Sequence, residues 1–334
     1  MEVDLHVTNR CNLKCKHCVY TSGEWEMPDM TLDTVKSLIP SFKKLGVKEV
    51  HITGGEPLVN KEFFDIAKCL HENGFGTRVQ TNGILITPEI ARKLKESGIE
   101  YVLISIDGLE KTHNSFRNND KSFDYAVNAV KICLEEGLYT RVNTVINKSN
   151  VQDLPELIKF INTLKPDQHS FFYLTPVGRG KNIKDLMLSL EEWKNIEEIV
   201  RKAGIENNCI EKIRLQNVIK DKENDKNCRD DNCLILANGD VYHCVFFIYS
   251  PYKLGNIYNE DLYELWNKNI NNILEETSNE RISEKKCNKQ KQNCRCNCSG
   301  LAYNLTGSIK SCDPRCNPKE NLIPSCIRTY IKMK

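Results

Sequence analysis

Residues 10–18 of the 334-residue chain read Arg10-Cys11-Asn12-Leu13-Lys14-Cys15-Lys16-His17-Cys18. Cysteines separated by three and then two residues can place three thiolates around one [4Fe–4S] cluster, which normally takes four. The fourth iron is then open to a small molecule. A structural zinc site closes with four ligands and usually arrives as paired C-x2-C units, and that pairing is missing here. The stretch therefore predicts an iron–sulfur site with one exchangeable position.

A second motif follows the next predicted strand. Residues 3–7 are strand-like and precede the cysteines, and residues 49–53 predict a strand that runs directly into Gly54-Gly55-Glu56-Pro57. Glycines at the end of a strand let the backbone approach a ligand closely. The carboxylate of Glu56 offers an acceptor for an ammonium group. Taken alone, the motif is also compatible with a simple turn carrying an exposed acid.

The two motifs together resemble the radical S-adenosylmethionine (radical SAM) superfamily. The resemblance implies that Cys11, Cys15 and Cys18 hold the cluster and that the amine and carboxylate of SAM chelate its open iron. Reductive cleavage would then give methionine and a 5′-deoxyadenosyl radical that abstracts hydrogen from a substrate. No flavin or nicotinamide motif is present, so flavodoxin or ferredoxin is the expected electron donor.

Hydrophobic periodicity over the first 215 residues predicts alternating strands and helices. Helices are expected at residues 31–46, 61–74, 88–98, 123–137, 154–164 and 190–203, and further strands at 77–81, 101–106, 140–146 and 170–175. Such repeats imply parallel strands with right-handed crossovers. Periodicity alone does not separate an open sheet from a barrel. The resemblance selects an α/β fold of the incomplete (β/α)6 TIM-like barrel type for residues 1–215, followed by a small cysteine-rich Fe–S domain at 216–334.

Polar residues follow the predicted strands where a parallel architecture gathers its ligands. The resemblance implies that Ser105 contacts the SAM ribose and that Arg117, expected in a loop, or Arg141 meets the SAM carboxylate. His17 stands where the family usually has an aromatic residue beside the adenine, although a solvent-facing loop histidine is equally compatible. The predicted SAM-binding residues are His17, Gly54, Gly55, Glu56, Asn82, Ser105, Asp107, Arg117, Arg141 and Asn143.

The chain changes character after residue 216, where a charged linker at 220–227 leads into a tail with ten cysteines. The tail contains a Gly-Asp-x-x-x-Cys hairpin ending at Cys244, a Leu-Gly-Asn-Ile segment at 254–257, a short helix with Leu262, Leu265 and Trp266, and an Asp-Pro-x-Cys ending at Cys316. These features resemble the SPASM extension of radical SAM peptide-modifying enzymes. The extension implies two auxiliary [4Fe–4S] clusters, hence three in total.

The resemblance also implies ligand sets for these clusters. The first would take Cys228, Cys233, Cys244 and Cys298, and the second Cys287, Cys294, Cys296 and Cys316. The later group reads C-x6-C-x-C-x-C instead of the family's usual C-x2-C-x5-C-x3-C. Alternate residues of an extended chain point to opposite sides, so the partition is open, and Cys312 or Cys326 could replace Cys296. So many ligands and so few long apolar runs predict a tail that folds only with its metal.

Composition indicates where such a protein works. Sixteen cysteines without a signal peptide favour metal ligands over disulfides, and no apolar stretch approaches the length of a membrane span. The formal charge of +2 predicts neither a nucleic-acid nor a membrane partner. A cytoplasmic enzyme is therefore expected.

The substrate is the least determined property. SPASM enzymes most often act on ribosomally made peptides, so a crosslink, thioether, epimerisation or other oxidation of a peptide is expected. Because the chain starts just before its first strand, a separate leader-binding protein would deliver that peptide. The alternative is a dehydrogenase or decarboxylase of a small molecule: a sugar, an amino acid or a tetrapyrrole precursor. A non-catalytic electron carrier is disfavoured, since it would need no Gly54-Gly55-Glu56-Pro57 motif.

Overall fold

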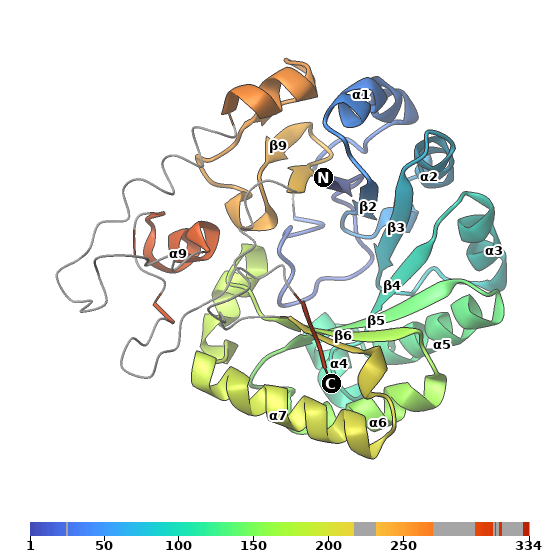
Figure 1. Cartoon of the computed structure of the whole chain (residues 1–334), viewed down its shortest axis with the longest axis vertical. Coiled ribbons are helices and arrows are strands. Elements are labelled where there is room, and N and C mark those ends of the chain that lie inside the picture. The colour runs from blue at the N-terminus through green and yellow to red at the C-terminus, as the bar shows by residue number, and fades with distance from the viewer. Residues whose placement is uncertain are drawn as a thin grey trace.

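The computed structural model describes residues 1–24, 26–216, 232–269, 298–309, 311, 314–315 and 330–333. At its centre is a curved sheet with the strand order β10-β9-β8-β1-β2-β3-β4-β5-β6-β7-β11 (Figure 1). The strands are β1 (Glu2–His6), β2 (Glu49–Thr53), β3 (Gly76–Thr81), β4 (Tyr101–Ser105), β5 (Tyr139–Ile146), β6 (Gln168–Tyr173), β7 (Ile213–Gln216), β8 (Asn232–Ile235), β9 (Asp240–Tyr242), β10 (Gly255–Asn256) and β11 (Tyr330–Lys332). The helices are α1 (Leu32–Lys44), α2 (Phe63–Glu72), α3 (Pro88–Glu96), α4 (Glu110–Arg117), α5 (Ser122–Glu135), α6 (Leu154–Leu164), α7 (Leu190–Glu206) and α9 (Ser299–Thr306).

Strands β1 to β7 run parallel to one another, and helices cover the outer side of the sheet (Figure 1). This arrangement confirms the predicted incomplete (β/α)6 barrel. Strand β7 is an addition to the six expected strands. It has only four residues, too few for an alternating pattern to stand out in the sequence, and it pairs with β6.

Helix α4 is a second element that the periodicity did not predict. It lies between β4 and α5 and ends at Arg117, with Asn118 in the left-handed conformation at φ 56°. The expectation that Arg117 lies in a loop is therefore wrong. The eight residues of α4 are mostly polar, because only one face of this short helix is buried, and so they carry a weak helical signal.

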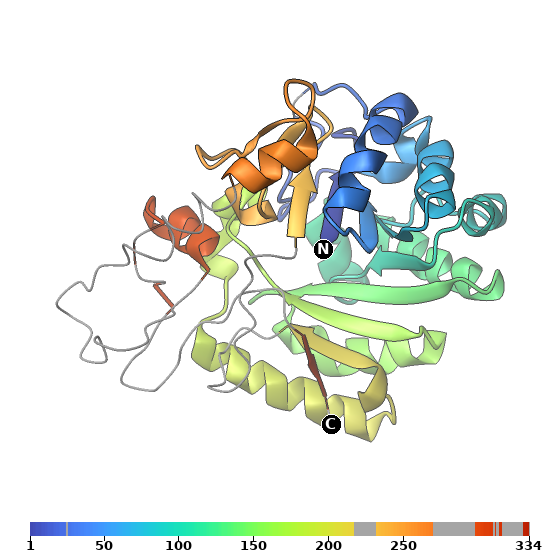
Figure 2. The same cartoon turned by 45° about the horizontal axis from the view of Figure 1, so that its top comes forward.

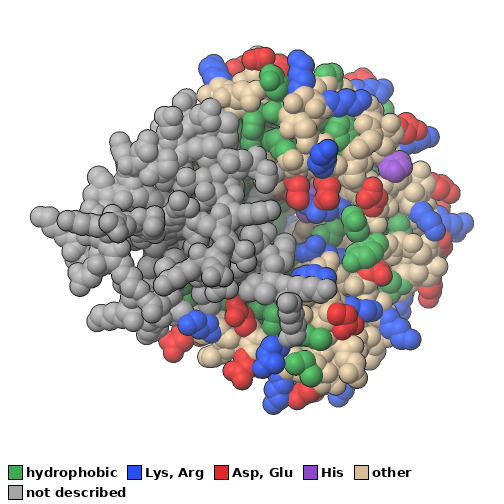
Figure 3. All heavy atoms as spheres, viewed as in Figure 1, with side chains coloured by type: hydrophobic (Ala, Val, Ile, Leu, Met, Phe, Trp, Pro, Cys, Tyr) green, Lys and Arg blue, Asp and Glu red, His purple; other side chains and the backbone are tan. Residues whose placement is uncertain are grey.

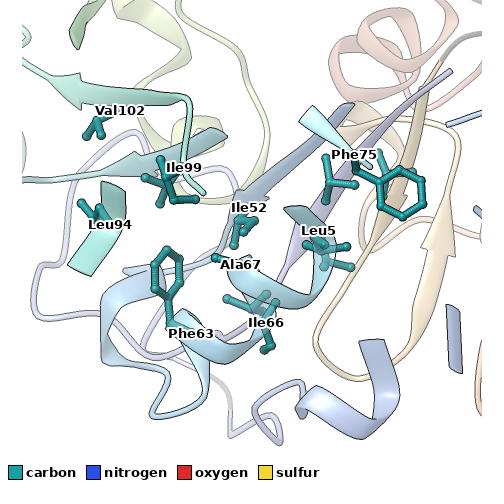
Figure 4. Close-up of a cluster of buried hydrophobic side chains, with 14 of the residues drawn as sticks. Leu5, Ile52, Phe63, Ile66, Ala67, Phe75, Leu94, Ile99 and Val102 are labelled. Atoms are coloured by element: carbon teal, nitrogen blue, oxygen red, sulfur yellow. The ribbon is translucent and has the colours of Figure 1, made fainter. Parts of the chain in front are cut away.

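The two faces of the barrel sheet have opposite character because successive side chains of a strand alternate. The outer face packs against α1 to α5 through fully buried residues, namely Val3, Leu5, Val50, Ile52, Val79, Val102, Ile104 and Val142 (Figure 4). Burying each such side chain contributes about 1.5–3 kcal/mol. The inner face carries most of the polar strand residues beside a few apolar ones such as Leu103, and we call the following polar residues the inner wall: Asp4, His6, His51, Arg78, Arg141, Asn143 and Ser170.

The tail continues the barrel sheet at both edges. Strand β8 pairs parallel with β1, placing Cys233 opposite Val3, and β11 pairs antiparallel with β7 (Figure 2). The expected short helix is present at residues 262–269, and its Leu265 is buried in the same apolar core as the barrel strands. The boundary near residue 215 thus lies within one sheet, and the division at 215 stays a prediction. The predicted linker at 220–227 lies outside the described residues.

The described part of the face seen in Figure 3 shows no dominant sign of charge. On the face seen in Figure 3, acidic and basic side chains lie beside one another over the described part of the molecule. Within that part of the chain, no helix is long and apolar enough to cross a membrane.

Packing of the tail into the barrel core gives a direct expectation for stability. Leu265→Ala should lower the free energy of unfolding of the whole protein by about 2–4 kcal/mol, because it opens a cavity in the shared core. The exposed Glu264→Ala in the same helix is the matched control. Urea unfolding followed by circular dichroism measures both. An unchanged barrel transition in Leu265→Ala would mean that the tail packs independently.

Candidate active site

Residues 7–24 follow β1 and carry Cys11, Cys15 and Cys18, and we call this segment the cysteine loop. It lies at the carboxyl end of the barrel. The backbone N–H of Leu13 donates to the Cys11 sulfur at 3.4 Å, and the Arg117 guanidinium donates to the Cys15 sulfur at 3.9 Å. Burial raises the pKa of Cys11 to about 12, and the nearby Cys15 and Cys18 thiols add to that rise. All three thiols lie on this one loop, and binding metal would require the loss of their protons.

These cysteines fit the cluster that the motif predicts. Three thiols come from one loop, and two of their sulfurs already accept hydrogen bonds that would stabilise thiolate charge. Among the described residues, no three His, Cys, Asp or Glu side chains converge as a single metal ion would require. Three thiolates around a multi-iron cluster are spread more widely than the ligands of one ion.

Arg179 holds the cysteine loop from the far side of the barrel. Its Nε donates to the Cys15 carbonyl at 2.8 Å, and its backbone N–H donates to the Cys18 carbonyl at 2.9 Å. Its guanidinium also pairs with Glu24 at 2.7 Å. The sequence analysis missed this residue. The flanking Gly178 and Gly180 were the available signal, since a Cβ at Gly178 would collide with the backbone of the cysteine loop.

The two glycines of the second motif lie directly against the backbone of the cysteine loop. The Gly55 N–H donates to the Thr8 carbonyl at 2.7 Å, and the Glu56 N–H donates to the Arg10 carbonyl at 2.9 Å. A Cβ at Gly54 would lie 2.6 Å from the Thr8 carbonyl oxygen, and one at Gly55 would overlap the Arg10 carbonyl. The glycines therefore admit the backbone of the cysteine loop, and their predicted contact with SAM stays a prediction.

Glu56 is fully buried beside the cysteine loop. Its carboxylate accepts from the Thr81 hydroxyl at 2.8 Å and from the Asn82 N–H at 2.9 Å. The Asn82 amide in turn donates to Asn12 at 2.7 Å and to the Cys11 sulfur at 4.0 Å. Burial raises the pKa of Glu56 to about 7. A buried carboxylate of this kind attracts an ammonium group, which would restore its full charge.

Asp107 and Arg117 form a buried ion pair on the other side of Cys15. The Arg117 Nε and Nη2 lie 2.7 and 2.6 Å from one oxygen of Asp107, and the other oxygen accepts from the Val145 N–H at 2.8 Å. Burial acts to raise the pKa of Asp107, but the charge of Arg117 holds it below its usual value. Arg117 is thus shared between Asp107 and the cysteine loop.

His17 is not a solvent-facing loop residue, since only 12% of its side chain is exposed. Its ring stacks on Phe116 with centroids 4.2 Å apart and planes at 2°, and its Nε2 lies 3.7 Å from Asp107. Burial lowers the pKa of His17 to about 3, so the ring is neutral. Within the described residues its Nδ1 has no hydrogen-bond partner.

The remaining predicted residues lie on the strands. Ser105, Asn143 and Ser170 are neighbours across β4, β5 and β6; Ser105 is the last residue of β4, whereas Asn143 and Ser170 lie within their strands. Arg141 lies two residues earlier on β5, roughly 7 Å deeper along the strand, where its guanidinium covers the Phe172 ring at 5.7 Å. The structure therefore brings His17, Glu56, Asn82, Asp107 and Arg117 to the cysteine loop and leaves Arg141 apart from them.

The described tail cysteines occupy two different clusters of buried side chains. Cys244 and Cys298 belong to one cluster with Tyr242. Cys233 belongs to the barrel core. Leu234 pairs with Tyr242 in the β8–β9 hairpin, so Cys233 faces the side opposite to Tyr242 and Cys244. This placement argues against the predicted ligand set in which Cys233 and Cys244 share a cluster.

The other tail cysteines named in the sequence analysis lie outside the described residues, and their assignments stay predictions; they are Cys228, Cys287, Cys294, Cys296, Cys312, Cys316 and Cys326.

A partial parallel barrel with three cysteines on the loop after β1, locked against a buried glutamate, is the architecture of an iron–sulfur enzyme that acts on SAM. Comparison with known families agrees. Residues 5–161 match the model of the radical SAM superfamily, and residues 227–299 match the SPASM model, an iron–sulfur cluster-binding domain. The chain belongs to the radical SAM superfamily and carries a SPASM domain.

Relatives of known activity include enzymes of two kinds. An Fe-coproporphyrin III synthase of Methanosarcina barkeri is 34% identical over 58% of this chain, a match that spans 49% of that protein. An AdoMet-dependent heme synthase of Nitratidesulfovibrio vulgaris is 25% identical over 96% of this chain and 93% of its own length. A mycofactocin maturase of Mycolicibacterium smegmatis is 29% identical over 75% of this chain and 66% of its own length.

Among solved structures, SuiB of Streptococcus suis bound to S-adenosylmethionine superposes with a TM-score of 0.78. The alignment covers 94% of this chain and 76% of SuiB at 20% identity, and it shows a common fold.

The raised pKa of Glu56 predicts a pH-dependent stability. The pKa of Glu56 is 4.5 in the unfolded chain and about 7 in the folded chain. Between these two pH values the folded chain keeps the Glu56 proton, whereas the unfolded chain has lost it. Stability should therefore fall as the pH rises through this window, by at most about 3 kcal/mol. Glu56→Gln should remove this part of the pH dependence, and the exposed Glu72→Gln should keep it. Urea unfolding of the metal-free protein at pH 5 and pH 8 measures the difference, and parallel behaviour of wild type and Glu56→Gln would contradict it.

The two faces of the tail hairpin predict different roles for its cysteines. After anaerobic reconstitution, Cys244→Ala should lose about four irons, one cluster, whereas Cys233→Ala should keep the iron content of the wild type. Both variants remove the same atom from a buried site, so each controls for the other. Equal iron loss from the two variants would restore Cys233 as a ligand.

Proposed function

We propose that this chain is a radical SAM enzyme that oxidatively decarboxylates a tetrapyrrole precursor. The observation that carries the proposal is the match with a heme synthase over almost the full length of both proteins, barrel and tail together. Conversion of a propionate side chain to a vinyl group removes one hydrogen atom, one molecule of carbon dioxide and one electron. Such a reaction needs a radical site, a binding place for carboxylates and an exit for the electron.

The radical site would be built by residues around the cysteine loop. Cys11, Cys15 and Cys18 would hold a [4Fe–4S] cluster that, with SAM bound, supplies the 5′-deoxyadenosyl radical. Glu56 would accept the ammonium of SAM, because it is buried next to the loop and its carboxylate accepts hydrogen bonds only from neutral donors among the described residues, namely Thr81, Asn82 and Leu58. The His17 ring would lie beside the adenine, with Phe116 behind it.

The remaining contacts follow from the ends of the strands. Ser105 and Asn143 would reach the ribose, since they are neighbours across β4 and β5 and Ser105 is the last residue of β4. Arg117 would balance the negative charge of the cysteine loop and of Asp107, and Asn82 would orient the loop through Asn12.

The electron exit would pass through the tail. Cys244 and Cys298 would be ligands of the first of two auxiliary [4Fe–4S] clusters, because they lie in one cluster of buried side chains. Flavodoxin or ferredoxin would supply the first electron and collect the last one. The proposed enzyme would contain three [4Fe–4S] clusters in total and would work in the cytoplasm.

Oxidative modification of a ribosomally made peptide is the second candidate, and the relation to a mycofactocin maturase favours it. Such a peptide would be presented by a separate leader-binding protein. The radical site and the electron exit would be the same in both cases.

An anaerobic assay separates the two substrates. The reconstituted protein with SAM and dithionite is given either Fe-coproporphyrin III or a precursor peptide encoded beside its gene. We expect the porphyrin to lose carbon dioxide and two hydrogens per modified propionate, with one 5′-deoxyadenosine formed for each. Mass spectrometry detects both products. An unchanged porphyrin together with a modified peptide would select the second candidate.

A further inference from the structure

His6 is a buried histidine that the radical site does not use. It is the last residue of β1 and only 1% exposed, and its ring lies 4.5 Å from that of Tyr20 in the cysteine loop. Its neighbours Leu5 and Val7 belong to the outer core, so its own side chain faces the inner wall. Within the described residues, neither ring nitrogen has a hydrogen-bond partner.

Ser170 is in the same situation across the barrel. It lies on β6, is fully buried, and its hydroxyl has no partner among the described residues. Phe171 packs into the outer core beside α7, which places Ser170 on the inner wall. Leaving a buried polar group without a partner costs about 1–3 kcal/mol, so two such residues facing one interior indicate a site that is completed by a ligand.

The groups on the inner wall favour an anionic ligand. Burial lowers the pKa of His6 to about 3, so its neutral ring offers one N–H donor, and Ser170 adds a hydroxyl donor. Arg141 brings a positive charge to the same height of the sheet as His6, following the register from β1 to β5. The acid nearest to His6 along β1, Asp4, is already paired with His51 at 3.1 Å and with Asn232 at 3.1 Å.

We propose that His6 and Ser170, together with Arg141, form a subsite on the inner wall that binds a carboxylate of the substrate. His6 leads into the cysteine loop, so this carboxylate would be held directly beneath the radical site. The subsite rests on the proposed function and deepens it, because it accounts for how a propionate side chain would be positioned. Fe-coproporphyrin III carries several propionates and is the probe.

The test compares His6→Phe and Ser170→Ala with His169→Gln in the reconstituted protein. His169 is also buried, but it faces outward and its Nε2 is bonded to Thr144 at 2.9 Å. The dissociation constant of Fe-coproporphyrin III, from an absorbance titration, should rise about 10- to 100-fold in His6→Phe, the effect of losing a hydrogen bond to a charged group. Ser170→Ala should show a smaller rise of the same sign, and the control should bind like the wild type.

One further measurement separates a binding role from a structural one. The thermal midpoint of the substrate-free variant should be equal or higher, because the change removes two buried nitrogens without partners.

The outcomes that would overturn the subsite are distinct. If the wild type binds the porphyrin and both variants bind it equally well, the subsite is refuted and the proposed function stands. A lowered thermal midpoint with unchanged binding in His6→Phe would make His6 a structural residue. If the wild type does not bind the porphyrin at all, the proposed substrate class is refuted, and the carboxylate subsite falls with it.

Discussion

The site depends on the backbone contact between the loop after β1 and the loop after β2. Two hydrogen bonds, from Gly55 to Thr8 and from Glu56 to Arg10, join these segments with no space for a side chain between them. This one contact fixes both the start of the cysteine loop and the position of the buried Glu56 carboxylate. Arg117 and Arg179 hold the later part of the loop, because both contact Cys15.

Charge within the site is balanced locally. A buried carboxylate and guanidinium are stable only with good geometry and further hydrogen bonds, and Asp107 with Arg117 meets both conditions. Arg117 also reaches the Cys15 sulfur, so the ion pair links the electrostatics of the barrel to the cysteine loop. On the inner wall, His6 and Ser170 are buried without partners among the described residues. These two residues mark the surface that we assign to the substrate.

Much of the fold could be predicted from local sequence, because helical and strand periodicities are strong where helices pack on one face of a sheet. The cysteine triplet and Glu56 could also be found from the sequence, because each lies in a short motif whose residue types and spacing indicate one kind of chemistry. Helix α4 and β7 could not be predicted, since they are short and their sequence signals weak. The role of Arg179 and the outward face of Cys233 depend on contacts between segments more than 150 residues apart in the chain, which a spacing pattern does not contain.

The most direct test of the account is the amount of 5′-deoxyadenosine formed from SAM by the anaerobically reconstituted protein with dithionite. The account predicts that the wild type forms it and that Cys15→Ala does not, while the iron bound by the tail is largely retained in the variant. Absence of 5′-deoxyadenosine from the wild type under a competent reductant, or its continued formation by Cys15→Ala, would contradict the assignment of Cys11, Cys15 and Cys18 to the radical site.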